Sequence, residues 1–266
     1  AYVQGYAGWQ NIVTLCARRP DARDGSVAHT KHMGVPHPSP LPSLPTQGNS
    51  SFHSTGLNPG YMGDVLPLSM SSMSRQIDRI VVQEISTFQY YPSPEIMFES
   101  MGFGSEPEAF QQRGERRTNW LNGLFRESIQ MVADGLEFAL DEVKSEMVIA
   151  IAENDLETAS GIVKTGTVAG QRWKWSGMKA SEERIIHETV WRMHDDVAPE
   201  WPTGKHSINI EGEPNMHLKI DAAWISDGLL GTAIHAVNAI EAVIAAPPGI
   251  QTFLELPSIA GRGTMR

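Results

Sequence analysis

The chain has 266 residues, of which 41% are apolar, enough to build one large domain or two small ones. Its formal net charge of −10 argues against nucleic acid and anionic membrane as partners, because an acidic surface repels phosphate groups. Cys16 is the single cysteine, which excludes an intrachain disulfide and favours a reducing compartment. With no signal peptide visible and no stretch near the ~20 apolar residues that span a bilayer, we expect a cytoplasmic protein.

Residues 1–47 end in the tract GVPHPSPLPSLPTQG, which places five prolines between Gly34 and Gly48. This density removes backbone donors and stiffens the chain, so it predicts a linker or an extended arm. Upstream, NIVTLCARRPDARDG could form one strand, but GYAGWQ does not match the GxGxxG fingerprint of a dinucleotide-binding fold. Residues 1–47 are therefore expected to be an incomplete Rossmann-like remnant of a cofactor domain or a flexible arm.

Three histidines, His29, His32 and His37, lie close together in this stretch. No carboxylate accompanies them at a known ligand spacing, so we expect no metal site.

Residues 48–140 alternate between helical and strand patterns. The segment DRIVVQEISTF (78–88) is rich in β-branched residues and predicts a strand, and PSPEIMFESMGF predicts a short helix that stops near Gly102. Apolar residues at helical spacing predict one helix before the strand, strained by Pro67, and a longer one after the short helix. The first carries Met62, Leu66, Met70, Met73 and Ile77, and the second Leu121, Phe125, Ile129, Val132, Leu136 and Leu140.

Residues beyond 160 read mainly as strands and one final helix. Strands are predicted over 161–178, 182–194, 205–212 and 215–224, with EGEPN joining the last two as a hairpin. A helix from about residue 229 to 246 stops at Pro247-Pro248-Gly249. Together these elements predict an α+β fold in residues 48–266, with a mixed, largely antiparallel sheet covered by helices.

Two features have a spacing that suits a binding site. In GNSSFHSTGLNPG (48–60), bare amides and small residues at a helix entrance can hold a polar ligand, or form an ordinary loop that caps the helix. In the final helix, Thr232, His235 and Asn238 share one face, while a mostly apolar stripe forms another. Spacing alone leaves open whether the polar face meets a ligand or water. The apolar stripe holds Leu230, Ile234, Val237, Glu241 and Ile244.

Several stretches in order resemble the 2,4-diaminopentanoate dehydrogenase and native amine dehydrogenase branch of the dihydrodipicolinate reductase-like superfamily. They are GNSSFHSTGLNPG followed by DVLPL, YYPSPEIMFESMGFG (90–104), TAIHAVNAIEAVIAAPPGI (232–250) and LPSIAGRG (256–263). The resemblance implies that residues 48–266 form a catalytic and dimerisation domain. It also implies NADP or NAD as cofactor, and reductive amination of a small carbonyl compound with ammonia, or the reverse oxidation of an amine.

The resemblance assigns expected roles to several residues. Asn58, Pro59, Gly60 and Asn238 would meet the cofactor. The substrate pocket, whose selectivity comes from shape, would be formed by Phe52, Leu57, Phe88, Tyr90, Tyr91, Leu124, Thr232 and His235. Each of the aromatic residues, taken alone, is also consistent with an ordinary core position.

The proton-handling group stays unassigned, because relatives supply it as a carboxylate from the cofactor domain. His53, Tyr91 and Glu95 are substitutes by chemistry only. We expect a homodimer that pairs through an open, apolar sheet face, and little activity unless residues 1–50 complete a cofactor site. The alternative is a non-catalytic relative that keeps the fold and the dimer interface without binding a dinucleotide.

Overall fold

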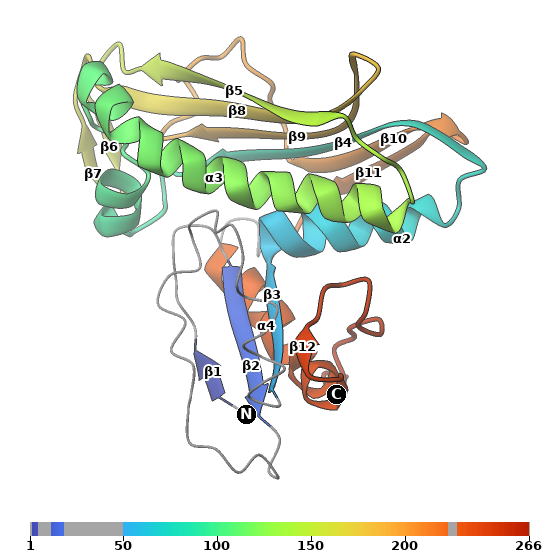
Figure 1. Cartoon of the computed structure of the whole chain (residues 1–266). Coiled ribbons are helices and arrows are strands. Elements are labelled where there is room, and N and C mark those ends of the chain that lie inside the picture. Colours follow the sequence, from blue (N-terminus) through green and yellow to red (C-terminus); the bar gives the residue numbers. More distant parts are fainter. Residues whose placement is uncertain (1, 5–11, 19–49, 223–227, 266) are drawn as a thin grey trace. The chain divides into compact units, whose positions relative to one another are not determined.

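The computed structural model describes residues 2–4, 12–18, 50–222 and 228–265. It divides the chain into two compact units (Figure 1). The terminal unit comprises Ala1–Val65 and Asp227–Arg266, and the central unit comprises Leu66–Ser226. The sequence suggested a boundary after residue 47, which lies outside the described residues, whereas the compact units divide after Val65.

The central unit is built on a six-stranded sheet in the order β11-β10-β4-β9-β8-β5. Strands β4 and β9 run parallel, and the other neighbours are antiparallel. The predicted α+β class with a mixed, largely antiparallel sheet is therefore confirmed for this unit. The six strands are β4 (Gln76–Thr87), β5 (Glu142–Ile151), β8 (Val168–Lys179), β9 (Glu182–Arg192), β10 (His206–Glu213) and β11 (Met216–Ile220).

Two helices, α2 (Leu66–Ser71) and α3 (Pro107–Gly135), lie along one face of this sheet (Figure 1). The Phe125 ring of α3 stacks on Trp175 of β8 with centroids 3.8 Å apart. Gly177 of β8 lets the helical layer approach closely, because a Cβ atom there would lie 2.8 Å from Ile129 Cγ2. This helix-covered face is the core of the unit. The remaining elements are η2 (Glu95–Ser100) and the small hairpin of β6 (Leu156–Thr158) and β7 (Gly161–Val163).

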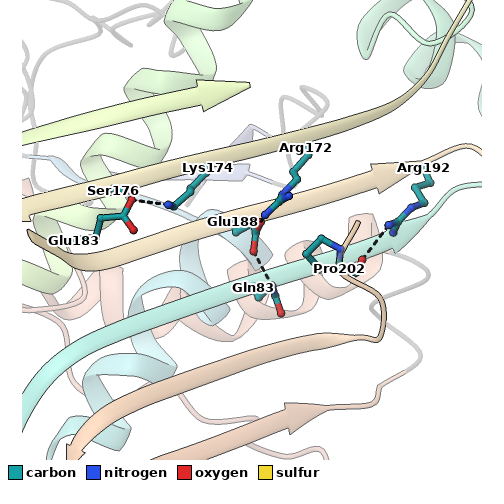
Figure 2. Close-up of polar contacts among 8 residues, drawn as sticks. All are labelled: Gln83, Arg172, Lys174, Ser176, Glu183, Glu188, Arg192 and Pro202. Atoms are coloured by element: carbon teal, nitrogen blue, oxygen red, sulfur yellow. Dashed lines mark hydrogen bonds and ion pairs between the residues drawn. The ribbon is translucent and has the colours of Figure 1, made fainter. Parts of the chain in front are cut away.

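The opposite face of the sheet carries ion pairs among the described residues (Figure 2). Glu188 accepts hydrogen bonds from Arg172 Nε and Gln83 Nε2, both at 2.7 Å, and is only 8% exposed. Glu183 pairs in the same way with Lys174 at 2.6 Å and with the Ser176 hydroxyl at 2.8 Å. The large apolar face expected from the sequence is thus instead a polar surface, interrupted by buried aliphatic side chains.

The terminal unit contains a small sheet in the order β1-β2-β3-β12. Strand β3 (Ser50–Gly56) is antiparallel to β2 (Ile12–Arg18) and parallel to β12 (Gly249–Ile250), while β1 (Tyr2–Gln4) pairs with β2. The helix α4 (Gly228–Ala245) contributes Ala236, Ala239 and Val243 to the core of this unit. A Rossmann-like character for the N-terminal segment stays a prediction.

Two predicted helices are shorter than expected. The helix predicted over Met62–Ile77 is replaced by η1 (Leu57–Val65) and α2, and Ile77 already belongs to β4. The Ser71 hydroxyl donates to the Leu68 carbonyl at 2.6 Å, and Arg75 N donates to Glu213 O, which starts pairing with β10. Helix α3 stops before Leu140, because Glu137 adopts a left-handed φ of 52°.

Helix α4 exposes part of its apolar surface, although Ala236, Ala239 and Val243 are buried. Leu230, Ile234 and Val237 of its apolar stripe are 48–59% exposed, whereas Thr232 on the polar stripe is 2% exposed. Thr232 accepts a hydrogen bond from Leu57 N, and the half-buried His235 packs against the Phe253 ring. None of the helices in the described ranges is long and apolar enough to cross a bilayer.

Candidate functional site

The Asn58-Pro59-Gly60 bend lies at the start of η1 and is buried. Its backbone is not helical: Asn58 has a φ of −153°, and Gly60 has a φ of +130°. A positive φ of this size strains any residue with a side chain, so the bend requires glycine even though a Cβ atom would meet only ordinary contacts with Thr55. A side chain at position 60 is therefore expected to destabilise the bend.

A hydrogen bond ties this bend to helix α4. Leu57 N donates to Thr232 Oγ1 at 3.2 Å, and both residues are buried. Asn238, two turns further along the helix, is half-buried, and its Nδ2 lies 3.9 Å from where a Cβ atom on Gly261 would be. The predicted cofactor residues of the bend and the helix thus belong to one compact unit.

Two histidines meet in the same unit. His53 of β3 is fully buried, and its Nδ1 lies 2.7 Å from the Gln251 carbonyl oxygen, so Nδ1 carries the proton and donates. The Phe253 ring packs against His53 at 5.0 Å and against His235 of α4 at 5.6 Å. Tyr61 packs against His235 at 5.1 Å on another side.

Burial keeps both imidazoles neutral. It lowers the pKa of His53, and burial with the neighbouring His53 lowers the pKa of His235 to about 4. The Nε2 atoms of both rings are buried and make no hydrogen bond within the part of the chain that the structure describes. A neutral ring with a bare nitrogen can accept a proton or a hydrogen bond from a ligand.

The other predicted pocket residues divide between the units. Phe52 precedes His53 on β3, so its side chain lies on the opposite face of that strand. In the central unit, the Phe88 ring lies 6.0 Å from Tyr91, and Leu124 of α3 is half-buried. Tyr90 is 83% exposed, and Glu95 is exposed in the first turn of η2.

Sequence reasoning missed a polar cluster on the helix-covered face of the sheet. Glu84 of β4 accepts a hydrogen bond from Trp191 Nε1 of β9 at 2.8 Å. Thr189 of β9 is the register partner of Glu84, and His206 begins β10 on its other side. A signal was available, because Ile80, Val82 and Glu84 alternate along β4 and so share one face.

A surface pocket of about 320 Å³ lies elsewhere in the central unit, where β4 begins. Its two arginines are already engaged: Arg75 pairs with Glu213, and Arg184 donates to the Asp78 carbonyl oxygen at 2.5 Å. None of the predicted site residues lines this pocket. Among the described residues, no group of three or more metal-binding side chains converges, and His29, His32 and His37 lie outside them.

This geometry defines an α+β protein, and its fold is similar to that of a solved amine dehydrogenase. The structure of amine dehydrogenase from Mycobacterium smegmatis is similar, with a TM-score of 0.64. That similarity covers 83% of this chain and 62% of the neighbour, at 20% identity, and shows a common fold.

Residues 61–264 match the 2,4-diaminopentanoate dehydrogenase C-terminal domain, and the chain belongs to that family. It is 30% identical over 232 residues to an amine dehydrogenase from Streptomyces virginiae, covering 82% of this chain and 63% of that protein. It is 27% identical over 215 residues to 2,4-diaminopentanoate dehydrogenase from Acetoanaerobium sticklandii, covering 80% and 59%. The chain thus spans about three fifths of the length of these relatives.

Proposed function

We propose that this protein is an NAD(P)H-dependent oxidoreductase acting on amines and imines. In the reductive direction, a carbonyl compound and ammonia lose water to form an imine, whose carbon accepts hydride and whose nitrogen accepts a proton. The family match over residues 61–264 carries the proposal, and the two curated relatives, an amine dehydrogenase and 2,4-diaminopentanoate dehydrogenase, support it.

Several described residues support the proposal of a nicotinamide cofactor. The Asn238 amide can both donate and accept hydrogen bonds, and His53 and His235 each have an Nε2 atom without a hydrogen bond among the described residues, on a ring that adds no charge. We assign Asn58, Pro59, Gly60 and Asn238 to cofactor contact. The cofactor, when bound, supplies or accepts hydride, so the protein has to position the imine and manage protons.

The pocket is proposed to be apolar and selective by shape. Within the terminal unit, we assign Phe52, Leu57, Thr232 and His235 to it. Of the three residues considered for proton handling, His53 has a buried acceptor nitrogen, whereas Glu95 is exposed to solvent. Burial disfavours the charged imidazolium, so a proton accepted by His53 would be passed on readily.

The test is NADPH consumption with a small aliphatic ketone or aldehyde and excess ammonium at mildly alkaline pH. One arm uses the 266-residue chain, and the other replaces residues 1–47 with the N-terminal cofactor region of the Streptomyces virginiae relative. We expect turnover in the second arm that requires both the carbonyl compound and ammonium. Absence of turnover in both arms would favour the non-catalytic alternative.

We also propose that the protein is a homodimer that pairs through the helix-free face of the six-stranded sheet. Support comes from the resemblance, which implies a dimerisation domain, and from the position of α2 and α3 along one face of the sheet, which leaves the other face open (Figure 1). Light scattering at micromolar concentration should give twice the chain mass of 29.2 kDa. A monomer mass at that concentration would contradict the proposal.

A further inference from the structure

The central unit holds a row of three hydrogen-bond acceptors on three neighbouring strands. His206, Glu84 and Thr189 lie on β10, β4 and β9, which are adjacent in the sheet. Glu84 and Thr189 are register partners, and Ser207, next to His206, pairs with Gln83. Side chains on one face of adjacent strands stand about 5 Å apart, so the three polar groups are neighbours.

Two members of this row are deeply buried, and the described residues offer their side chains no hydrogen-bond partner at the atoms named below. Thr189 is 0% exposed and His206 is 2% exposed. Neither Thr189 Oγ1 nor His206 Nδ1 makes a hydrogen bond to any residue in the described ranges. Leaving a buried polar group unpaired costs about 1–3 kcal/mol, so both atoms call for a partner that is not among the described residues.

The carboxylate between them is oriented by the protein. Trp191 Nε1 donates to Glu84 Oε1 at 2.8 Å, and a carboxylate has further lone pairs on both oxygens. Burial lowers the pKa of His206, with the charge of Glu84 opposing that shift, so the ring is neutral near pH 7 and can offer Nδ1 as an acceptor. The row therefore combines one negative charge with two neutral acceptors.

We propose that Glu84, Thr189 and His206 bind the primary ammonium group of an amine ligand. An ammonium group has three N–H donors and one positive charge. The row offers three acceptors, and one of them is a carboxylate that carries the opposite charge. A carboxylate-bearing ligand would meet the charge of Glu84 and be rejected. The role of this site in turnover rests on the proposed function, whereas ammonium binding rests on the strand geometry alone.

Binding can be followed at Trp191 in the intact 266-residue chain. In ¹⁵N-labelled protein, the seven tryptophans give indole N–H signals, and the Trp191 signal is the one lost in Trp191→Phe. We expect n-butylammonium to shift this signal saturably, because its target is the carboxylate that accepts the Trp191 hydrogen bond. Pentanoate and 1-butanol, tested at the same concentrations, should leave it unchanged.

Glu84→Gln is expected to weaken n-butylammonium binding about tenfold or more, since it removes the charge and keeps the shape. Glu84→Asp keeps the charge and should retain part of the affinity. The matched control is Glu146→Gln, which makes the same change in the same sheet at an exposed position on the opposite face. Unchanged dispersion of the other indole signals shows that each variant is folded.

The assignment of the ammonium site would be wrong if a folded Glu84→Gln variant bound n-butylammonium with wild-type affinity. It would also be wrong if pentanoate bound the wild-type protein as well as n-butylammonium does. That failure would leave the proposed function intact if NADPH-linked amination is found. Conversely, Glu84-dependent ammonium binding without any nicotinamide-linked turnover would support the site and count against the proposed function.

Discussion

Replacing Trp175 with alanine is expected to lower the free energy of unfolding of the central unit by about 3–5 kcal/mol. Trp175 is 1% exposed, stacks on Phe125 at 3.8 Å, and donates through Nε1 to Asn122 Oδ1 at 2.8 Å. It therefore joins β8 to α3 by both packing and a hydrogen bond. Truncation leaves a cavity between the helix and the sheet and an amide oxygen without its donor. Urea unfolding followed by far-UV circular dichroism measures the loss.

Two control variants test whether the loss of stability comes from the packing of Trp175 or from the removal of any aromatic side chain. Trp175→Phe retains an aromatic ring against Phe125 and should recover a substantial part of the loss. Tyr90→Ala removes an aromatic side chain that is 83% exposed and should change stability by about 0.5 kcal/mol or less. A Trp175→Ala loss as small as that of Tyr90→Ala would show that the helix and the sheet do not depend on this contact.

Arg192→Leu is expected to destabilise the central unit by about 3 kcal/mol. The Arg192 side chain donates to the carbonyl oxygens of Val197 at 2.8 Å and Ala198 at 3.2 Å. It also donates to the Pro202 carbonyl oxygen at 3.0 Å (Figure 2). Arg192 is 3% exposed, so leucine would fill part of the space and leave three carbonyls without their donors. Chemical denaturation measures the change, and faster proteolysis within residues 194–202 would locate it.

Arg192→Lys tests whether charge alone is enough. Lysine keeps the positive charge but lacks the planar fork that reaches three carbonyls, so we expect a large part of the loss to persist. Arg126→Leu is the surface control, because Arg126 is exposed and donates to Val143 O at 3.3 Å only. Equal stability of Arg192→Leu and Arg126→Leu would contradict the proposal that the hydrogen bonds of Arg192 stabilise residues 194–202.

The sequence predicts the strands of the central unit well where β-branched residues alternate or run together. Strands β4, β9, β10 and β11 lie where they were predicted, and the hairpin between β10 and β11 forms at the EGEPN turn. Strand β5 was missed because Glu142, Lys144 and Glu146 on its exposed face dilute the apolar pattern. Strand β3 was missed because its Ser, His and Thr residues are typical of loops, although they are buried in the structure.

The site was only partly predictable for a related reason. Hydrophobic patterning assumes that apolar stripes face inward, yet α4 buries Thr232 and exposes Val237. The hydrogen bond from Leu57 and the ring contacts of His235 stabilise that orientation, and both depend on residues far away in sequence. Glu84 was overlooked because its partner Trp191 is 107 residues away.

The most direct test of the account is oxidation of a primary aliphatic amine by the protein that carries the relative's cofactor region in place of residues 1–47. The assay follows the absorbance of reduced nicotinamide and, in the same samples, the ammonia released. We expect amine-dependent reduction of NADP⁺ or NAD⁺ with one ammonia released for each nicotinamide reduced. Ammonia release without nicotinamide reduction, or nicotinamide reduction without ammonia, would contradict it.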